Sequence, residues 1–69
     1  MHQPRSLDED RHTLEMGEAR TLVYGFLQYE ESQEWLERAL RVTERRYGRG
    51  SVARVKAYMR VIWREELLK

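Results

Sequence analysis

The sequence predicts an all-α protein: a small three-helix bundle that follows a mobile acidic N-terminal arm and assembles as a dimer. Apolar residues recur at helical intervals along three stretches of the chain, and serine or glycine residues separate these stretches. We therefore divide the chain into a flexible acidic arm at residues 1–13 and a three-helix domain at residues 14–69. The helices are expected near residues 14–31, 33–47 and 51–68.

The first expected helix has one apolar stripe. Gly17 and Gly25 each cost about 1 kcal/mol relative to alanine inside a helix. A strand is the alternative for the middle of this stretch, but adjacent Leu22 and Val23 break the strict alternation that a half-buried strand shows. We therefore expect a helix, with a stripe formed by Met16, Ala19, Leu22, Val23, Phe26, Leu27 and Tyr29.

The second expected helix begins after Ser32, a residue type that caps helix N-termini. Acidic and basic residues alternate along its outer face at spacings that allow ion pairs within the helix. The bases of this helix are therefore expected to be largely neutralised, except in its last turn. The expected pairs are Glu34 with Arg38, Glu37 with Arg41, and Arg41 with Glu44.

A short connection joins the second and third expected helices. Gly48 is suited to a left-handed helix end, and Ser51 is expected to cap the third helix. Such a short turn makes the two helices neighbours in space. Trp35 and Trp63 lie on their apolar stripes, so we expect the two indole rings to meet between them.

The size of the chain favours self-association. A protein of 69 residues buries only about 60% of its unfolded surface and is marginal as a monomer. The chain contains no cysteine, so no disulfide or thiolate metal site can stabilise it. Two Trp, four Tyr and one Phe supply apolar mass. We expect a homodimer.

Several classes of function are disfavoured by the composition. The chain has no cysteine, and its two histidines, His2 and His12, have no helical metal-ligand spacing, so we expect no enzyme, metal site or cofactor. No stretch approaches the roughly 20 apolar residues of a membrane span. Leu7 is the one strongly apolar residue between the initiator and Asp10, so we expect no signal peptide and a cytoplasmic protein.

Charge is distributed unevenly along the chain. Residues 1–37 hold nine acids and three bases, a net charge of −6, whereas residues 38–64 hold nine bases and one acid, a net charge of +8. Such asymmetry is typical of a surface that faces a polyanion, and equally of two packed helices of opposite charge. The positions of the individual charges must distinguish these interpretations.

The basic residues around the turn and along the third helix form the candidate site. Lys56, Arg60 and Arg64 share one helix face and have no acid three or four residues away within the helix. Ala53 and Ala57 beside them would let a partner approach closely. In the alternative interpretation, the acidic first helix packs against this row and neutralises it. The candidate binding residues are Arg45, Arg46, Arg49, Arg54, Lys56, Arg60 and Arg64.

Residues 42–59 (VTERRYGRGSVARVKAYM) resemble the DNA-binding helix-turn-helix. The resemblance implies that the third helix enters the major groove, with Ser51, Arg54 and Val55 nearest the bases. Val55 also lies on the predicted core face, so we expect contacts with phosphates rather than with base edges.

The sequence leaves two hypotheses for function. The first is a small regulatory protein that binds nucleic acid, DNA rather than RNA, through the basic helix and the arginine-rich turn. The alternative is a protein-interaction module, an adaptor or an inhibitor of a larger protein. It would act through an exposed helix face or through the acidic N-terminal half.

Overall fold

The protein folds into three helices. The computed structural model describes the backbone of residues 7–68 and the side chains of residues 9–68. Helix α1 spans Leu7–Gln28, α2 spans Gln33–Tyr47 and α3 spans Arg49–Ile62, and a single wide turn of π-helix, η1, continues α3 over Trp63–Leu67. Residues 7–68 contain no strand, so the all-α, three-helix prediction is confirmed.

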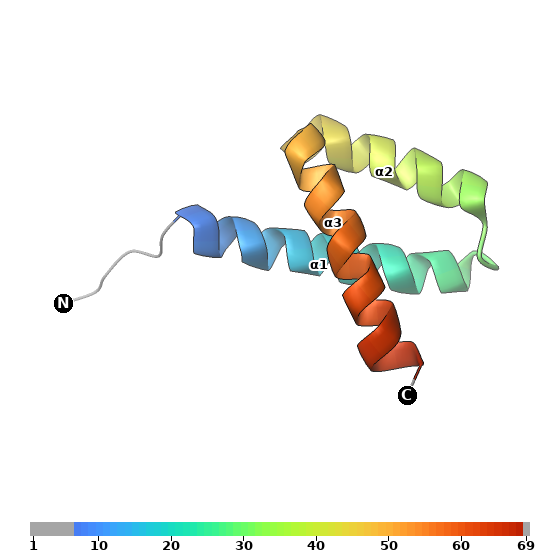
Figure 1. Ribbon diagram of the computed structural model, residues 1–69. Helices are drawn as coiled ribbons and strands as arrows, with labels where there is room; N and C mark the ends of the chain where they lie inside the picture. Colours follow the sequence, from blue (N-terminus) through green and yellow to red (C-terminus); the bar gives the residue numbers. More distant parts are fainter. Residues whose placement is uncertain (1–6, 69) are drawn as a thin grey trace.

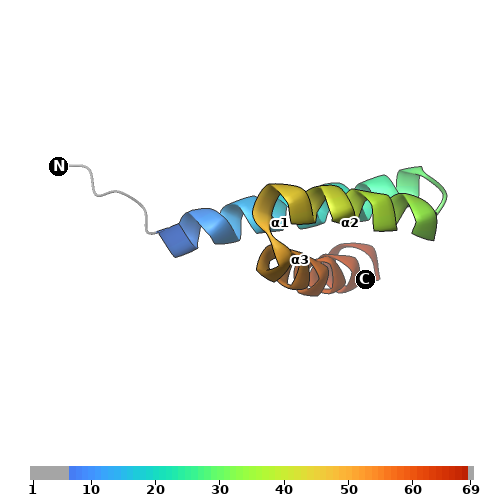
Figure 2. The same cartoon turned by 90° about the horizontal axis from the view of Figure 1, so that it is seen from above.

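The helices form two layers. Helices α1 and α2 run antiparallel and side by side, and α3 turns away at the end of α2 and crosses α1 (Figure 1). Seen from above, α1 and α2 share one layer and α3 lies in the other (Figure 2). Helices α2 and α3 diverge from their common turn, so they remain apart at the opposite end (Figure 1).

Helix α1 begins earlier and ends earlier than the sequence predicts. It starts at Leu7 rather than near residue 14, so the second half of the expected arm is helical. A contact with α3 ties this segment down: His12 Nδ1 lies 3.2 Å from the Tyr58 hydroxyl, and the two rings meet edge to face. The predicted arm also includes residues 1–6, which lie outside the described residues, and its mobility stays a prediction.

The C-terminus of α1 ends in a Schellman-type motif. The Glu31 N–H donates to the Phe26 carbonyl at 2.7 Å, and the Glu30 N–H donates to the Leu27 carbonyl at 3.2 Å. Glu30 and Glu31 both have φ of 57°, a left-handed conformation that glycine adopts more readily than glutamate. The chain reverses at this point and enters α2.

Helix α2 begins as predicted. The Trp35 N–H donates to the Ser32 hydroxyl at 3.1 Å, which confirms Ser32 as the N-cap. Arg45 and Arg46 lie in the last turn, where a positive charge is favourable next to the free carbonyl groups.

The turn between α2 and α3 is a single residue. Gly48 has φ of 95° and ψ of 171°, values that essentially only glycine adopts, and its N–H donates to the Glu44 carbonyl at 2.8 Å. Gly48 therefore ends α2, as predicted, although its ψ is far from the left-handed helical value that was expected, and it also precedes the first residue of α3. The prediction of Ser51 as N-cap is wrong, because Gly48 allows the helix to restart at Arg49. Ser51 lies in the first turn and is only 4% exposed.

The core lies between α1 and α3. Half-buried side chains surround it, most of them from α2 and α3. The rings of Trp35 and Trp63 do not meet, contrary to the prediction: Trp35 stacks on Tyr29, with centroids 5.2 Å apart, and Trp63 meets Phe26 edge to face at 6.2 Å. The two tryptophans lie where α2 and α3 have diverged. Trp63 therefore packs on Phe26 of α1, and Trp35 packs on Tyr29, just after α1. The fully buried apolar residues are Ala19, Leu22, Val23, Val55 and Ile62.

Candidate binding groove

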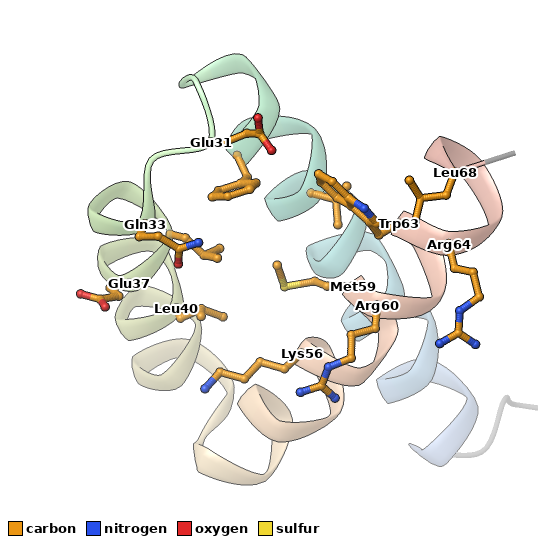
Figure 3. Close-up of a pocket in the computed structure, with 13 residues that line it drawn as sticks. Glu31, Gln33, Glu37, Leu40, Lys56, Met59, Arg60, Trp63, Arg64 and Leu68 are labelled. Atoms are coloured by element: carbon orange, nitrogen blue, oxygen red, sulfur yellow. The ribbon is translucent and has the colours of Figure 1, made fainter.

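Because α2 and α3 diverge, an open groove lies between them, with α1 as its floor. Its volume is about 790 Å³. Figure 3 shows the Leu40 side chain entering it from α2, that of Met59 from α3 and that of Trp63 from η1. The lining residues are Val23, Phe26, Glu31, Gln33, Leu36, Glu37, Leu40, Lys56, Met59, Arg60, Trp63, Arg64 and Leu68.

The interior of the groove is apolar. Leu36 and Leu40 of α2, Met59 of α3, Trp63 of η1 and Phe26 of α1 are all half-buried. The sequence predicted most of these residues as core, since they lie on apolar helix stripes. Their stripes do face inward, but α2 and α3 do not close over them, so part of each side chain faces the groove.

The two sides of the groove carry opposite charge. Lys56 and Arg60 of α3 and Arg64 of η1 lie on one side, and Glu37 lies on the α2 side, with Glu31 in the preceding turn; the charged ends of Arg64 and Glu37 point away from the groove (Figure 3). All five residues are exposed. Within the part of the chain that the structure describes, no hydrogen bond or ion pair involves any of these three bases. The row predicted from the sequence is therefore open to solvent and not neutralised by α1.

Two acidic residues of α1, Glu15 and Glu18, contact residues outside the basic row. Glu15 is 2% exposed, and both of its carboxylate oxygens accept from Arg54 Nε, at 2.9 and 3.0 Å. Glu18 accepts from the Thr43 hydroxyl of α2 at 3.1 Å. The alternative interpretation of the sequence was that the acidic first helix neutralises the candidate bases. This neutralisation is seen for Arg54, which pairs with Glu15 of α1.

The Arg54 hydrogen bonds hold the pKa of Glu15 below its usual value, against the opposing effect of burial. A hydrogen bond with the Ser51 hydroxyl and the positive charges of Arg54 and Arg11 lower this pKa further. Glu15 is therefore an ionised carboxylate in the interior, and Arg54 of α3 supplies its hydrogen bonds. Sequence reasoning missed this pair because its members are 39 positions apart.

A second polar link connects α1 to the end of the chain. Glu66 of η1 accepts from Arg20 at 2.8 Å and from the Tyr24 hydroxyl at 2.8 Å. The hydrogen bond to Glu66 raises the pKa of Tyr24. This link and the Glu15–Arg54 pair fix α3 and η1 across α1 at two points.

The remaining candidate bases do not join the row on α3. Arg49 is exposed, with its Nε atom 3.5 Å from Glu44, and Arg45 is exposed on α2. Arg46 lines a separate hollow of about 370 Å³ beside the N-terminal half of α1, which also includes Asp10, Glu15 and Ser51. The structure brings together three of the seven predicted residues and disperses the other four.

The ion pairs expected along α2 form only in part. Arg38 lies 3.4 Å from Glu34, as predicted. Glu44 pairs with Arg49 across the turn rather than with Arg41, and among residues 9–68 Arg41 has no ion pair with Glu37 or Glu44. Gly48 causes this change, because it brings the start of α3 next to the last turn of α2.

The residues that the helix-turn-helix resemblance places nearest the bases of DNA are not available on this surface. Ser51 and Val55 are buried, and Arg54 is engaged by Glu15. The burial of Ser51 and Val55 argues against base reading by these two residues, whereas the Arg54 side chain remains 43% exposed.

Two further features bear on function. Among the described residues, no three His, Cys, Asp or Glu side chains are grouped so that they could hold a metal ion. None of the helices within residues 7–68 has both the length and the apolar character that crossing a bilayer requires.

No family model, no curated protein and no solved structure matches this chain.

Proposed function

We propose that this protein is a protein-interaction module, an adaptor or an inhibitor, that receives a helix of another protein in the groove between α2 and α3. It acts by binding rather than by catalysis. The observation that carries the proposal is the open apolar groove with charged sides. A helix laid into such a groove would bury its apolar face, a common mode of peptide recognition.

The shape of the groove supports a helix as the bound element. Its walls are two helices and its floor is a third, so a fourth helix would complete a four-helix arrangement. The apolar residues of the groove would then lose their remaining contact with water. Burial of apolar surface is the dominant favourable term in such associations.

A selection from a displayed library of helical peptides tests this proposal. We expect enrichment of peptides with apolar residues at i, i+3, i+4 and i+7. Their binding should be lost with Met59→Lys, which places a charge in the groove, and weakened with Leu68→Lys, whose wild-type side chain is 66% exposed and therefore contributes little to folding. Val61→Lys is the matched control, because Val61 is an exposed apolar residue of α3 outside the groove.

Circular dichroism must show that the variants remain helical. If no peptide is enriched, or if Val61→Lys abolishes binding as effectively as Met59→Lys, the groove is not the binding site and the proposal is wrong.

A second candidate function is the binding of nucleic acid, DNA rather than RNA, as in a small regulatory protein. It is supported by the row of Lys56, Arg60 and Arg64, which is exposed and has no acidic partner in the described chain. The row spans only about 12 Å of helix; apolar side chains lie beside it, and the acids Glu31 and Glu37 lie across the groove from it. These neighbours favour a protein partner.

Titration of labelled duplex DNA and of RNA at low and moderate salt would test the second candidate. Phosphate contacts require a steep loss of affinity with salt. Sedimentation at the same concentrations would test the expected homodimer. A cytoplasmic location is the remaining part of the proposal, to be checked by fractionation of cells that make the protein.

A further inference from the structure

The bases on the groove differ from the other exposed bases that face neighbouring helices. Arg54 is held by Glu15, Arg20 by Glu66, and Arg49 lies near Glu44. Lys56, Arg60 and Arg64 have no such partner among residues 9–68. Three like charges in a row repel one another, and helix neighbours of like charge are mildly destabilising. A partner that supplies negative charge would remove this repulsion.

The row also has a defined geometry. Its members are spaced i, i+4 and i+8, with Lys56 and Arg60 on α3 and Arg64 on η1, so they extend over about 12 Å along this continuous helix. Lys56 and Arg60 lie at the end of the groove nearest the α2–α3 turn, and Arg64 lies further along, on η1, with its guanidinium turned to the outer side (Figure 3). A helix in the groove would pass Lys56 and Arg60 with one flank, and the flexible Arg64 side chain borders the same flank. Acidic residues spaced three or four apart on that flank would come opposite them.

The opposite side of the groove favours a different flank. Glu31, in the turn before α2, and Glu37, on the outer side of α2, are exposed there, and their negative charge disfavours carboxylates on that flank (Figure 3). The acidic row of a bound helix must therefore be restricted to one flank. A duplex nucleic acid, which presents negative charge in all directions, does not match these two sides.

We infer that the natural partner of the groove is an amphipathic protein helix with an apolar face, a row of carboxylates along the flank that meets Lys56, Arg60 and Arg64, and no acids on the flank that meets α2. This inference rests on the proposed function and specifies its partner. The apolar face supplies most of the affinity, and the charges set the choice of partner and its orientation.

Three synthetic 18-residue peptides test the inference. They share one apolar face and one neutral flank of glutamines, and the other flank carries three Glu, three Gln or three Lys at i, i+4 and i+8. We expect the Glu peptide to bind about tenfold more tightly than the Gln peptide at low salt, and the Lys peptide to bind most weakly, since exposed ion pairs are individually weak. Fluorescence anisotropy of labelled peptides at two salt concentrations measures this order.

Variants of the protein locate the effect. The triple variant Lys56→Glu, Arg60→Glu, Arg64→Glu should reverse the order and bind the Lys peptide most tightly. The control triple variant Arg38→Glu, Arg41→Glu, Arg45→Glu has the same change in charge on exposed residues of α2 outside the groove lining, and it should preserve the order.

The outcomes distinguish the proposed helix-binding function from the inference about the charge of the bound helix. If none of the three peptides binds, the proposed function itself fails. Equal binding of all three, or equal effects of the two triple variants, leaves the groove as a helix-binding site and overturns the inference about charge. Displacement of the Glu peptide by duplex DNA that binds the wild type but not the groove variant would identify the row as a phosphate-binding surface and also overturn the inference.

Discussion

Arg54 of α3 binds the carboxylate of Glu15 of α1, with its Nε atom 2.9 and 3.0 Å from the two oxygens. Glu15 is 2% exposed, whereas the Arg54 side chain is 43% exposed. The pair therefore joins α1 to α3 at the boundary between the interior and the solvent. It also engages the Nε atom of Arg54 with α1.

The first prediction concerns the stability that depends on this pair. Glu15→Gln removes the negative charge and leaves Arg54 with a neutral amide in a buried position. We expect the free energy of unfolding to fall by about 2 kcal/mol, less than for a fully buried pair because Arg54 is partly solvated. Urea denaturation measures the change. Glu37→Gln, an exposed carboxylate without a partner among the described residues, is the control and should change stability by less than about 0.5 kcal/mol.

The second prediction concerns pH. The pKa of Glu15 is lower in the folded protein than its usual value of 4.5, so the unfolded chain binds the proton more tightly. The stabilisation from Glu15 is therefore present above about pH 5 and is lost as the pH falls through 4.5 towards the lower folded-state pKa. Urea denaturation at several pH values between 3 and 7 should show a smaller acid-induced loss for Glu15→Gln than for the wild type. Identical slopes would contradict the lowered pKa.

The third prediction uses two glycines of α1 that have different surroundings. A Cβ atom at Gly17 would meet nothing within 4 Å, whereas one at Gly25 would overlap the Trp35 ring. Gly17→Ala should therefore stabilise the protein by about 1 kcal/mol through helix propensity. Gly25→Ala gains the same propensity but forces Trp35 off α1, and we expect a net loss of about 1–3 kcal/mol. Thermal unfolding of the two variants measures both effects, and equal shifts would contradict the close approach of Trp35.

The fourth prediction concerns the end of α1. Glu30 has φ of 57° at the position of the Schellman-type motif that glycine usually occupies. Glu30→Gly should stabilise the protein by about 1 kcal/mol, because it removes the steric cost of the left-handed conformation. Glu30→Ala is the control: it removes the same side chain but keeps the Cβ atom, so denaturation should show little change. A loss of stability in the glycine variant would contradict this account.

Much of the fold follows from interactions between residues close in sequence. The start of α2 was predictable because the Ser32 hydroxyl caps an N–H only three residues away. The end of α2 was predictable because Gly48 alone tolerates the backbone conformation required there. The start of α1 was not predictable in this way, because its first turns have few apolar residues and His12 finds its partner, Tyr58, on α3.

The candidate site was predictable in part. The spacing of Lys56, Arg60 and Arg64 places them on one face of any helix, and the absence of acids at neighbouring positions leaves them unpaired within that helix. The apolar groove beside them could not be predicted, since a stripe of apolar residues looks the same whether a neighbouring helix covers it fully or only in part. Arg54 likewise has no acid three or four positions away, but it lies on a different face of α3 and pairs with Glu15 of α1.

The sequence by itself determined three helices, the turn at Gly48 and the basic row of α3, because helix periodicity, capping and backbone sterics act over a few residues. Only the tertiary structure decided which bases are neutralised and which apolar residues remain accessible. These depend on the direction in which α3 leaves Gly48 and crosses α1, which brings Glu15 to Arg54 and Glu66 to Arg20. The same direction holds α3 away from α2, and the groove follows from that separation.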